Sequence, residues 1–149
     1  TEELTRLISQ TLKKPVDISL DLLDDDVKNE TRVASGAMLC ACLPETRLFC
    51  QPFQDLDRTM DVSKGFLDGL CNPRSIVTIY QVLNTVLSSQ LERWELTKTS
   101  PLTIRSSSRE LSLETEFREP GKWIDLISGT SHEAGQKVEI RLGIRDISR

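Results

Sequence analysis

The sequence has 149 residues, 38% of them hydrophobic and 28% charged, and a formal net charge of -4 at pH 7. This length predicts one domain, 1–149, that is large enough to bury a core of its own. The basic residues do not cluster, which argues against binding to nucleic acid, and no apolar run is long enough to cross a membrane. The opening stretch, TEELTRLISQTLKK, carries acids where a signal peptide carries bases, so we expect a cytoplasmic protein.

The first predicted elements are a helix and a strand. Residues 2–13 place apolar side chains at helical spacing, and Pro15 ends that helix. Residues 16–22 alternate between apolar and polar side chains, which predicts a half-buried strand. We expect this strand to end at the acidic run 24–26, because three like charges resist burial.

The next segment fits two structures. Residues 32–43 are largely apolar without a clear period, so they match a buried strand and a buried helix alike. We interpret them together with RLFCQPF, residues 47–53, as a hairpin that turns at 44–46; the alternative is a helix over 32–43. Pro52 then ends the second strand or confines it to a sheet edge. Residues 54–72 are predicted to be irregular or to contain a short helix.

The strongest helical pattern covers residues 73–94. Asn72 is a candidate N-cap, and Pro73 suits the first helical position. Apolar and aromatic residues share one stripe that Val77 and Val82 widen, so we expect burial on more than one side. The stripe consists of Ile76, Ile79, Tyr80, Leu83, Val86, Leu87, Gln90, Leu91 and Trp94.

Alternating apolar and polar residues follow this helix and predict strands. The predicted strands are WELTKT (94–99), PLTIRS (101–106), ELSLETEF (110–117), KWIDLIS (122–128) and KVEIRLGIRDI (137–147). Their short connections favour antiparallel pairing. Helices followed by strands predict an α+β fold, in which an N-terminal helix and a mixed segment precede the long helix 73–94, packed on a mainly antiparallel C-terminal sheet.

The four cysteines are the main candidates for chemistry. Four thiolates can bind zinc, but the chain lacks the two Cys-x-x-Cys pairs that are typical of such sites. Apolar residues surround the first two thiols in sequence, so we predict reduced, buried cysteines that bind no metal. Structural zinc or a reactive thiol within residues 40–71 is the alternative. The cysteines are Cys40, Cys42, Cys50 and Cys71.

No other motif points to catalysis or to a cofactor. His132, the only histidine, lies in GTSHEAG, which matches neither a zinc-protease nor a serine-hydrolase motif. The acidic run DLLDDDVKNE lacks the spacing of a calcium loop, and no glycine-rich phosphate loop is present. We therefore predict that the chain is not an enzyme and needs no cofactor. A small enzyme without a recognisable motif is a further alternative.

The remaining hypothesis is a protein-interaction module, such as an adaptor, a chaperone-like protein or a subunit of a complex. In size, acidity and helix–strand pattern the chain is similar to small secretion chaperones and assembly adaptors, although no motif carries that likeness. We expect WELTKTSPLTIRS (94–106) and the last strand (137–147) to offer sheet edges to a protein partner, a second copy of the chain included. Arg141 and Arg145 are the candidate partner-binding residues, because their charges favour an acidic surface.

Overall fold

The computed structural model describes residues 17–23, 25–43, 46–52, 54, 65–88, 93–115, 121–133 and 139–148. The helix predicted over 2–13 lies outside these residues. The described elements run in the order β1 (Asp17–Asp21), α2 (Asp26–Cys42), β2 (Arg47–Gln51), α3 (Ser75–Ser88), β3 (Glu95–Thr99), β4 (Leu102–Arg105), β5 (Arg109–Glu114), β6 (Lys122–Asp125), β7 (Ser131–His132) and β8 (Gly143–Ser148). This order confirms the predicted α+β fold.

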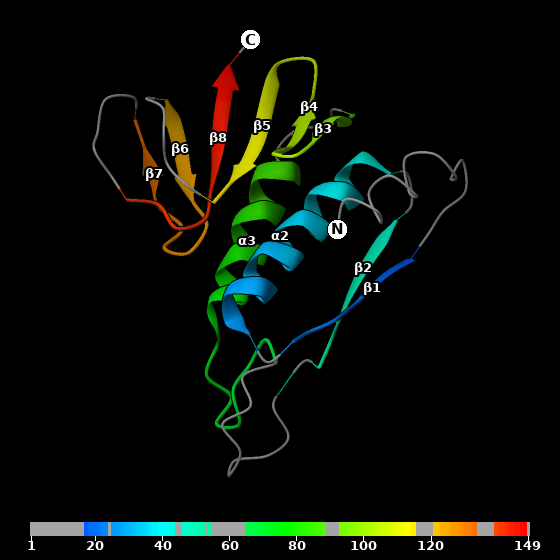
Figure 1. Ribbon diagram of the computed structural model, residues 1–149, viewed down its shortest axis with the longest axis vertical. Coiled ribbons are helices and arrows are strands. Elements are labelled where there is room, and N and C mark those ends of the chain that lie inside the picture. The colour runs from blue at the N-terminus through cyan, green and yellow to red at the C-terminus, as the bar shows by residue number, and fades with distance from the viewer. Residues whose placement is uncertain are drawn as a thin grey trace.

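The two described helices, α2 and α3, lie between two sheets of unequal size (Figure 1). The larger sheet has the strand order β3-β4-β5-β8-β6-β7, and every neighbouring pair in it is antiparallel. Among the described residues, the smaller sheet consists of β1 and β2, which are parallel. Consecutive parallel strands need a crossover connection, and α2 provides it. The small sheet was not predicted from the sequence.

The hairpin predicted over 32–53 is wrong, and the helical alternative is right. Asp25 begins α2 by accepting a hydrogen bond from the Lys28 amide at 3.1 Å, and this bond lowers the pKa of Asp25. In the sequence of α2, small residues stand where large apolar side chains would mark a helical period. One of them, Gly36, brings the helix so close to the small sheet that an added Cβ would lie 3.0 Å from the Leu48 side chain.

The predicted helix 73–94 exists, but its described part is Ser75–Ser88. Asn72 does not cap it, because the helix begins only at Ser75; the backbone and side-chain N–H groups of Asn72 donate to the Asp68 carboxylate. Trp94 is buried, yet it lies beyond the helix and donates from its indole nitrogen to the Leu87 carbonyl at 3.3 Å. Within the described residues 65–74, the chain is irregular, as one of the two predictions had it.

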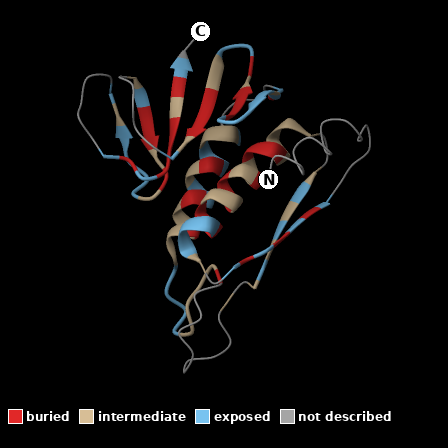
Figure 2. Ribbon diagram, in the orientation of Figure 1, coloured by how far each residue is buried: buried red, intermediate tan, exposed pale blue. Residues whose placement is uncertain are grey.

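The core joins both helices to the large sheet. Ile79 and Leu83 of α3 belong to the same buried cluster as Ile104, Leu111 and Ile144 of the sheet. Figure 2 shows this arrangement as buried segments on the strands and on the inner faces of the helices. The cluster confirms that the long helix packs against the C-terminal sheet. Neither α2 nor α3 has the length and apolar character that a membrane-crossing helix needs.

The last strand does not offer a sheet edge, contrary to prediction. It begins only at Gly143, and β8 lies between β5 and β6 in the interior of the sheet. The edges of the large sheet are instead β3, which falls in the predicted edge segment 94–106, and β7. A partner that pairs with a free strand edge must therefore use another strand than β8.

Candidate functional site

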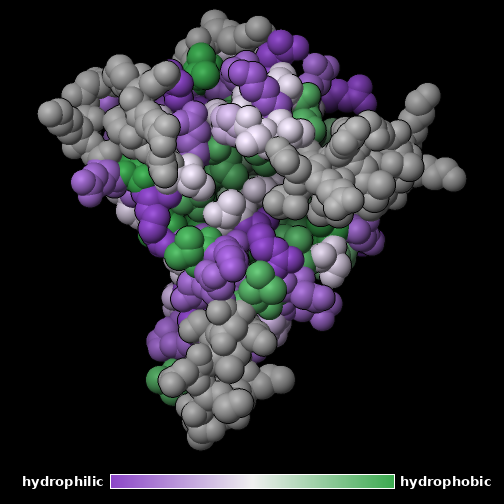
Figure 3. Space-filling model, in the orientation of Figure 1, coloured by the Kyte–Doolittle hydropathy of each residue, from purple (hydrophilic) through white to green (hydrophobic). Residues whose placement is uncertain are grey.

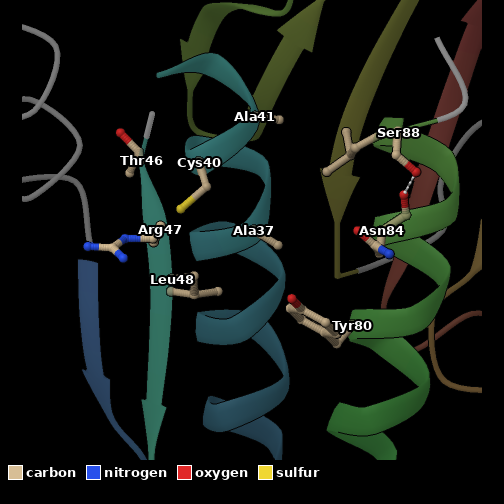
Figure 4. A pocket seen from close by; sticks show the side chains of 10 residues that line it. Ala37, Cys40, Ala41, Thr46, Arg47, Leu48, Tyr80, Asn84 and Ser88 are labelled. Carbon is tan, nitrogen blue, oxygen red and sulfur yellow. Dashed lines mark hydrogen bonds between the residues drawn. The ribbon is translucent and has the colours of Figure 1, made fainter. Parts of the chain in front are cut away.

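A groove of about 440 Å³ lies between α2, α3 and β2 (Figure 4). Among the described residues, the face drawn in Figure 3 mixes hydrophilic side chains with apolar ones, which are visible in the middle of the molecule. The groove itself combines small or apolar side chains with a few polar ones, which is the usual character of a binding site. Its lining consists of Ala37, Cys40, Ala41, Thr46, Arg47, Leu48, Tyr80, Asn84, Leu87 and Ser88.

The outer edge of β2 forms one wall of this groove. Three consecutive residues, Thr46, Arg47 and Leu48, line it. Side chains alternate between the two faces of a strand, so Arg47 and Leu48 of β2, together with Thr46 just before it, meet the same groove along the strand's edge. In Figure 4, β2 lies between β1 and α2. Among the described residues, no strand pairs with β2 on the side away from β1.

In the described part of the chain, one face of the small sheet packs against the core and the other is exposed. Leu48 and Cys50 are partly buried and pack against the core, whereas Arg47, Phe49 and Gln51 are exposed. Arg47 donates two hydrogen bonds of 3.0 Å to Asp17 across the pair of strands. Parallel strands are usually buried on both faces, and a sheet of two strands is marginally stable. A third strand would therefore stabilise this sheet.

The edges of the large sheet are protected, unlike that of β2. The register of β3 shifts between Leu96 and Lys98, and the shift marks a bulge or similar irregularity. Glu95 and Lys98 add charges there, while β7 has only two residues. Bulges, charges and short strands are the means by which proteins prevent edge pairing. Within β2 only Arg47 carries a charge. The register between β2 and β1 is regular.

A row of polar residues on α3 forms the opposite wall of the groove. Tyr80, Asn84 and Ser88 are spaced by four residues, so they lie on one side of the helix. The prediction that Tyr80 belongs to the buried stripe is wrong, because 45% of this residue is exposed. Its ring contacts Phe66 edge-on, with centroids 6.3 Å apart. In the sequence only the four-residue spacing of these side chains marks this wall, and exposed helix faces share that spacing in general.

The four cysteines do not share one setting. Cys40 and Cys42 lie on α2 and Cys50 on β2, all partly buried, whereas Cys71 is exposed in the turn before α3. The Cys71 sulfur accepts a hydrogen bond from the Gln54 amide at 3.1 Å. In the part of the chain that the structure describes, no group of three or more histidine, cysteine or acidic residues is placed to hold a metal ion. The absence of bound metal stays a prediction, which stoichiometric zinc in the purified protein would contradict.

Alkylation of the native protein with iodoacetamide near pH 8 is expected to modify Cys71 well before the other three thiols. The thiolate is the reactive form. Burial raises the pKa of Cys40 to about 11, with a contribution from Cys50, and that of Cys42 to about 12. Burial also raises the pKa of Cys50, although Arg32 opposes it. Mass spectrometry of partly modified protein would show the order, and early modification of Cys40 or Cys42 would contradict it.

The same shifts predict how stability depends on pH. The pKa values of Cys40 and Cys42 in the folded chain lie above the ordinary value of 9.0, so the folded state holds these protons more tightly. Their contribution to stability is complete below pH 9. It is lost as the pH rises from 9 through about 11 and 12, because only the unfolded chain releases the protons early in that window.

Arg141, a predicted partner-binding residue, is bound within the chain. Its guanidinium donates from Nη2 to Glu30 Oε1 at 2.9 Å and lies 2.7 Å from Oε2 through Nη1. The Ser75 hydroxyl donates to the same carboxylate at 2.5 Å. Glu30 is on α2 and Ser75 begins α3, so this cluster fastens the segment before β8 to both helices. Sequence reasoning missed it because the three residues are far apart in the chain.

The other two residues singled out from the sequence lie on the large sheet. Arg145 is half-buried in β8, with Ser112 and Trp123 as its cross-strand neighbours. His132 lies in β7, and its Nε2 is 3.0 Å from the Thr130 hydroxyl. Neither residue contributes to the groove. The predicted partner-binding residues Arg141 and Arg145 therefore do not line the candidate site.

No protein-family model, no curated protein and no solved structure matches this chain.

Proposed function

We propose that the chain is a non-catalytic protein-interaction module, an adaptor or chaperone-like subunit, that captures an extended segment of a protein partner by adding it as a strand to β2. The observation that carries this proposal is the outer edge of β2, with which no described strand pairs, next to a groove of about 440 Å³. In strand addition, main-chain hydrogen bonds provide affinity, and pockets for alternate side chains provide specificity.

The groove favours apolar side chains on the captured segment. Ala37, Ala41, Leu48 and Leu87 provide apolar surface, and small residues on α2 leave room above the helix. An added strand would direct every second side chain toward this surface. Its other side chains would lie on the exposed face beside Phe49. We therefore expect the partner segment to alternate apolar and polar residues.

A library of random peptides displayed on phage tests the proposal. Selection against the purified protein is expected to enrich alternating sequences of this kind. In the complex, amide hydrogens on the outer edge of β2 should exchange more slowly with deuterium than in the free protein, because they acquire hydrogen-bond partners. Failure to select any peptide that protects β2 would contradict the proposal.

A pair of matched variants locates the binding site. Ala41→Leu adds an apolar side chain inside the groove and should abolish peptide binding. Gln81→Leu adds the same side chain to an exposed position of α3 that does not line the groove, and it should leave binding unchanged. Circular dichroism of both variants checks folding. Equal binding by both would show that peptides bind elsewhere.

A second copy of the chain is another possible source of the added strand. Sedimentation of the wild-type protein would then reveal self-association that Ala41→Leu also removes.

The formal charge of -4 and the scattered basic residues favour a protein partner over nucleic acid. A cytoplasmic location stays a prediction.

A further inference from the structure

A strand added to β2 has a second edge, and that edge faces α3. Figure 4 shows α3 running beside β2 with α2 between them, and Tyr80 and Asn84 directed from α3 toward the groove. The amide N–H and carbonyl groups on this second edge would lose contact with water. Main-chain polar groups that are buried without partners cost free energy. The far wall of the groove must therefore supply partners if an extended segment is to bind tightly.

The polar side chains of α3 have the chemistry to supply them. The Tyr80 hydroxyl both donates and accepts, and the Asn84 amide offers two N–H donors and one carbonyl acceptor. Within the described ranges, neither the Tyr80 hydroxyl nor the Asn84 amide group has a hydrogen-bond partner. The Ser88 hydroxyl, by contrast, donates to the Asn84 carbonyl of its own helix. Two of the three polar residues thus remain available to a ligand.

The spacing of the two residues also fits an extended chain. Residues four apart on a helix are separated by about 6 Å along its axis. Main-chain groups on one edge of a strand recur every second residue, which is about 6.7 Å. Tyr80 and Asn84 can therefore meet successive peptide groups of the same edge. The edge-on contact with Phe66, with centroids 6.3 Å apart, restricts the motion of the Tyr80 ring.

We infer that Tyr80 and Asn84 bind the main chain of the captured segment along the edge that faces away from β2. This inference rests on the proposed function and names what the site recognises: an extended main chain held along both edges, in addition to the apolar side chains that face the groove. The ligand class is therefore extended or unfolded protein segments, and a partner helix, whose main-chain groups are already paired, is excluded.

The test combines two variants with methylated peptides. The probe is the peptide that the displayed library enriches most, synthesised with N-methyl groups either on amides that face β2 or on amides that face α3. Tyr80→Phe and Asn84→Ala each remove only polar groups from α3, and each is expected to weaken binding roughly two- to tenfold, the effect of one hydrogen bond. Gln81→Ala, on α3 but outside the groove, is the matched control and should change nothing.

The decisive result is how the substitutions on α3 alter the effect of peptide methylation on binding. In the wild-type protein, methylation on either edge should weaken binding. In the Tyr80→Phe/Asn84→Ala double variant, methylation of α3-facing amides should have no further effect, whereas methylation of β2-facing amides should still weaken binding. If both variants bind the unmodified peptide as well as the wild type does, this inference is wrong and the proposed function stands. If no selected peptide binds the groove, the proposed function fails with it.

Discussion

Replacing Arg141 with alanine is expected to lower the free energy of unfolding by about 3 kcal/mol, the lower end of the range for breaking a buried ion pair. The side chain of Glu30 is only 3% exposed, and both of its oxygens lie within 2.9 Å of the Arg141 guanidinium. Without that guanidinium the buried carboxylate keeps the Ser75 hydroxyl as its partner among the described residues. The lower end applies because 50% of the Arg141 side chain is exposed.

Urea unfolding followed by circular dichroism would measure this loss. Arg47→Ala is the matched control, because it breaks an ion pair with Asp17 that is exposed on both sides and is expected to cost less than about 1 kcal/mol. The double variant Glu30→Gln/Arg141→Ala should be more stable than Arg141→Ala alone, since the unpaired buried charge is gone. Equal losses for Arg141→Ala and Arg47→Ala would show that the Glu30 cluster does not stabilise the fold.

This cluster has a consequence for the proposed site. Glu30 lies on α2 and Ser75 on α3, so the Glu30 carboxylate joins the two helices that line the groove, and Arg141 pairs with that carboxylate. A charge reversal at Arg141 would therefore disturb folding as well as any association with an acidic partner surface. Because half of its side chain remains exposed, contact with a partner through Arg141 stays a prediction.

The strands of the large sheet could be predicted because burial of one face imposes alternation on the sequence. Leu111 and Leu113 are buried toward the core, and Glu110 and Glu114 lie on the other face. The same rule failed for α2, where Ala34, Gly36, Ala37 and Ala41 replace the large apolar side chains that would mark one helical face. These small residues allow α2 to pack closely. For the same reason the sequence lacks large apolar side chains at helical spacing, which would have indicated a helix.

The candidate site could not be predicted from the sequence for a different reason. Its walls come from α2, β2 and α3, and the parallel pairing of β1 with β2 brings them together only after α2 has crossed over. Tyr80 fits an apolar stripe by its position, yet the structure exposes it. No local pattern distinguishes an aromatic residue of the core from one on a groove, because the difference depends on segments far away in the chain.

Replacing Leu83 with alanine is expected to destabilise the protein by about 2–5 kcal/mol, the range for Leu→Ala in a well-packed core. Leu83 is completely buried and belongs to the cluster that joins α3 to the large sheet. For a chain of this length the loss corresponds to a melting temperature lower by roughly 4–20 °C. Calorimetry or thermal circular dichroism would measure the shift.

Two further substitutions make this result specific to burial. Leu70→Ala makes the same chemical change where 69% of the residue is exposed, so the melting temperature should stay almost unchanged. Val86→Ala should have an intermediate effect, because Val86 is only partly buried against the same cluster and loses fewer carbon atoms. The order Leu83, Val86, Leu70 follows from how many apolar contacts each side chain makes within the fold. A melting temperature that Leu83→Ala leaves unchanged would mean that α3 does not pack on the large sheet through this residue.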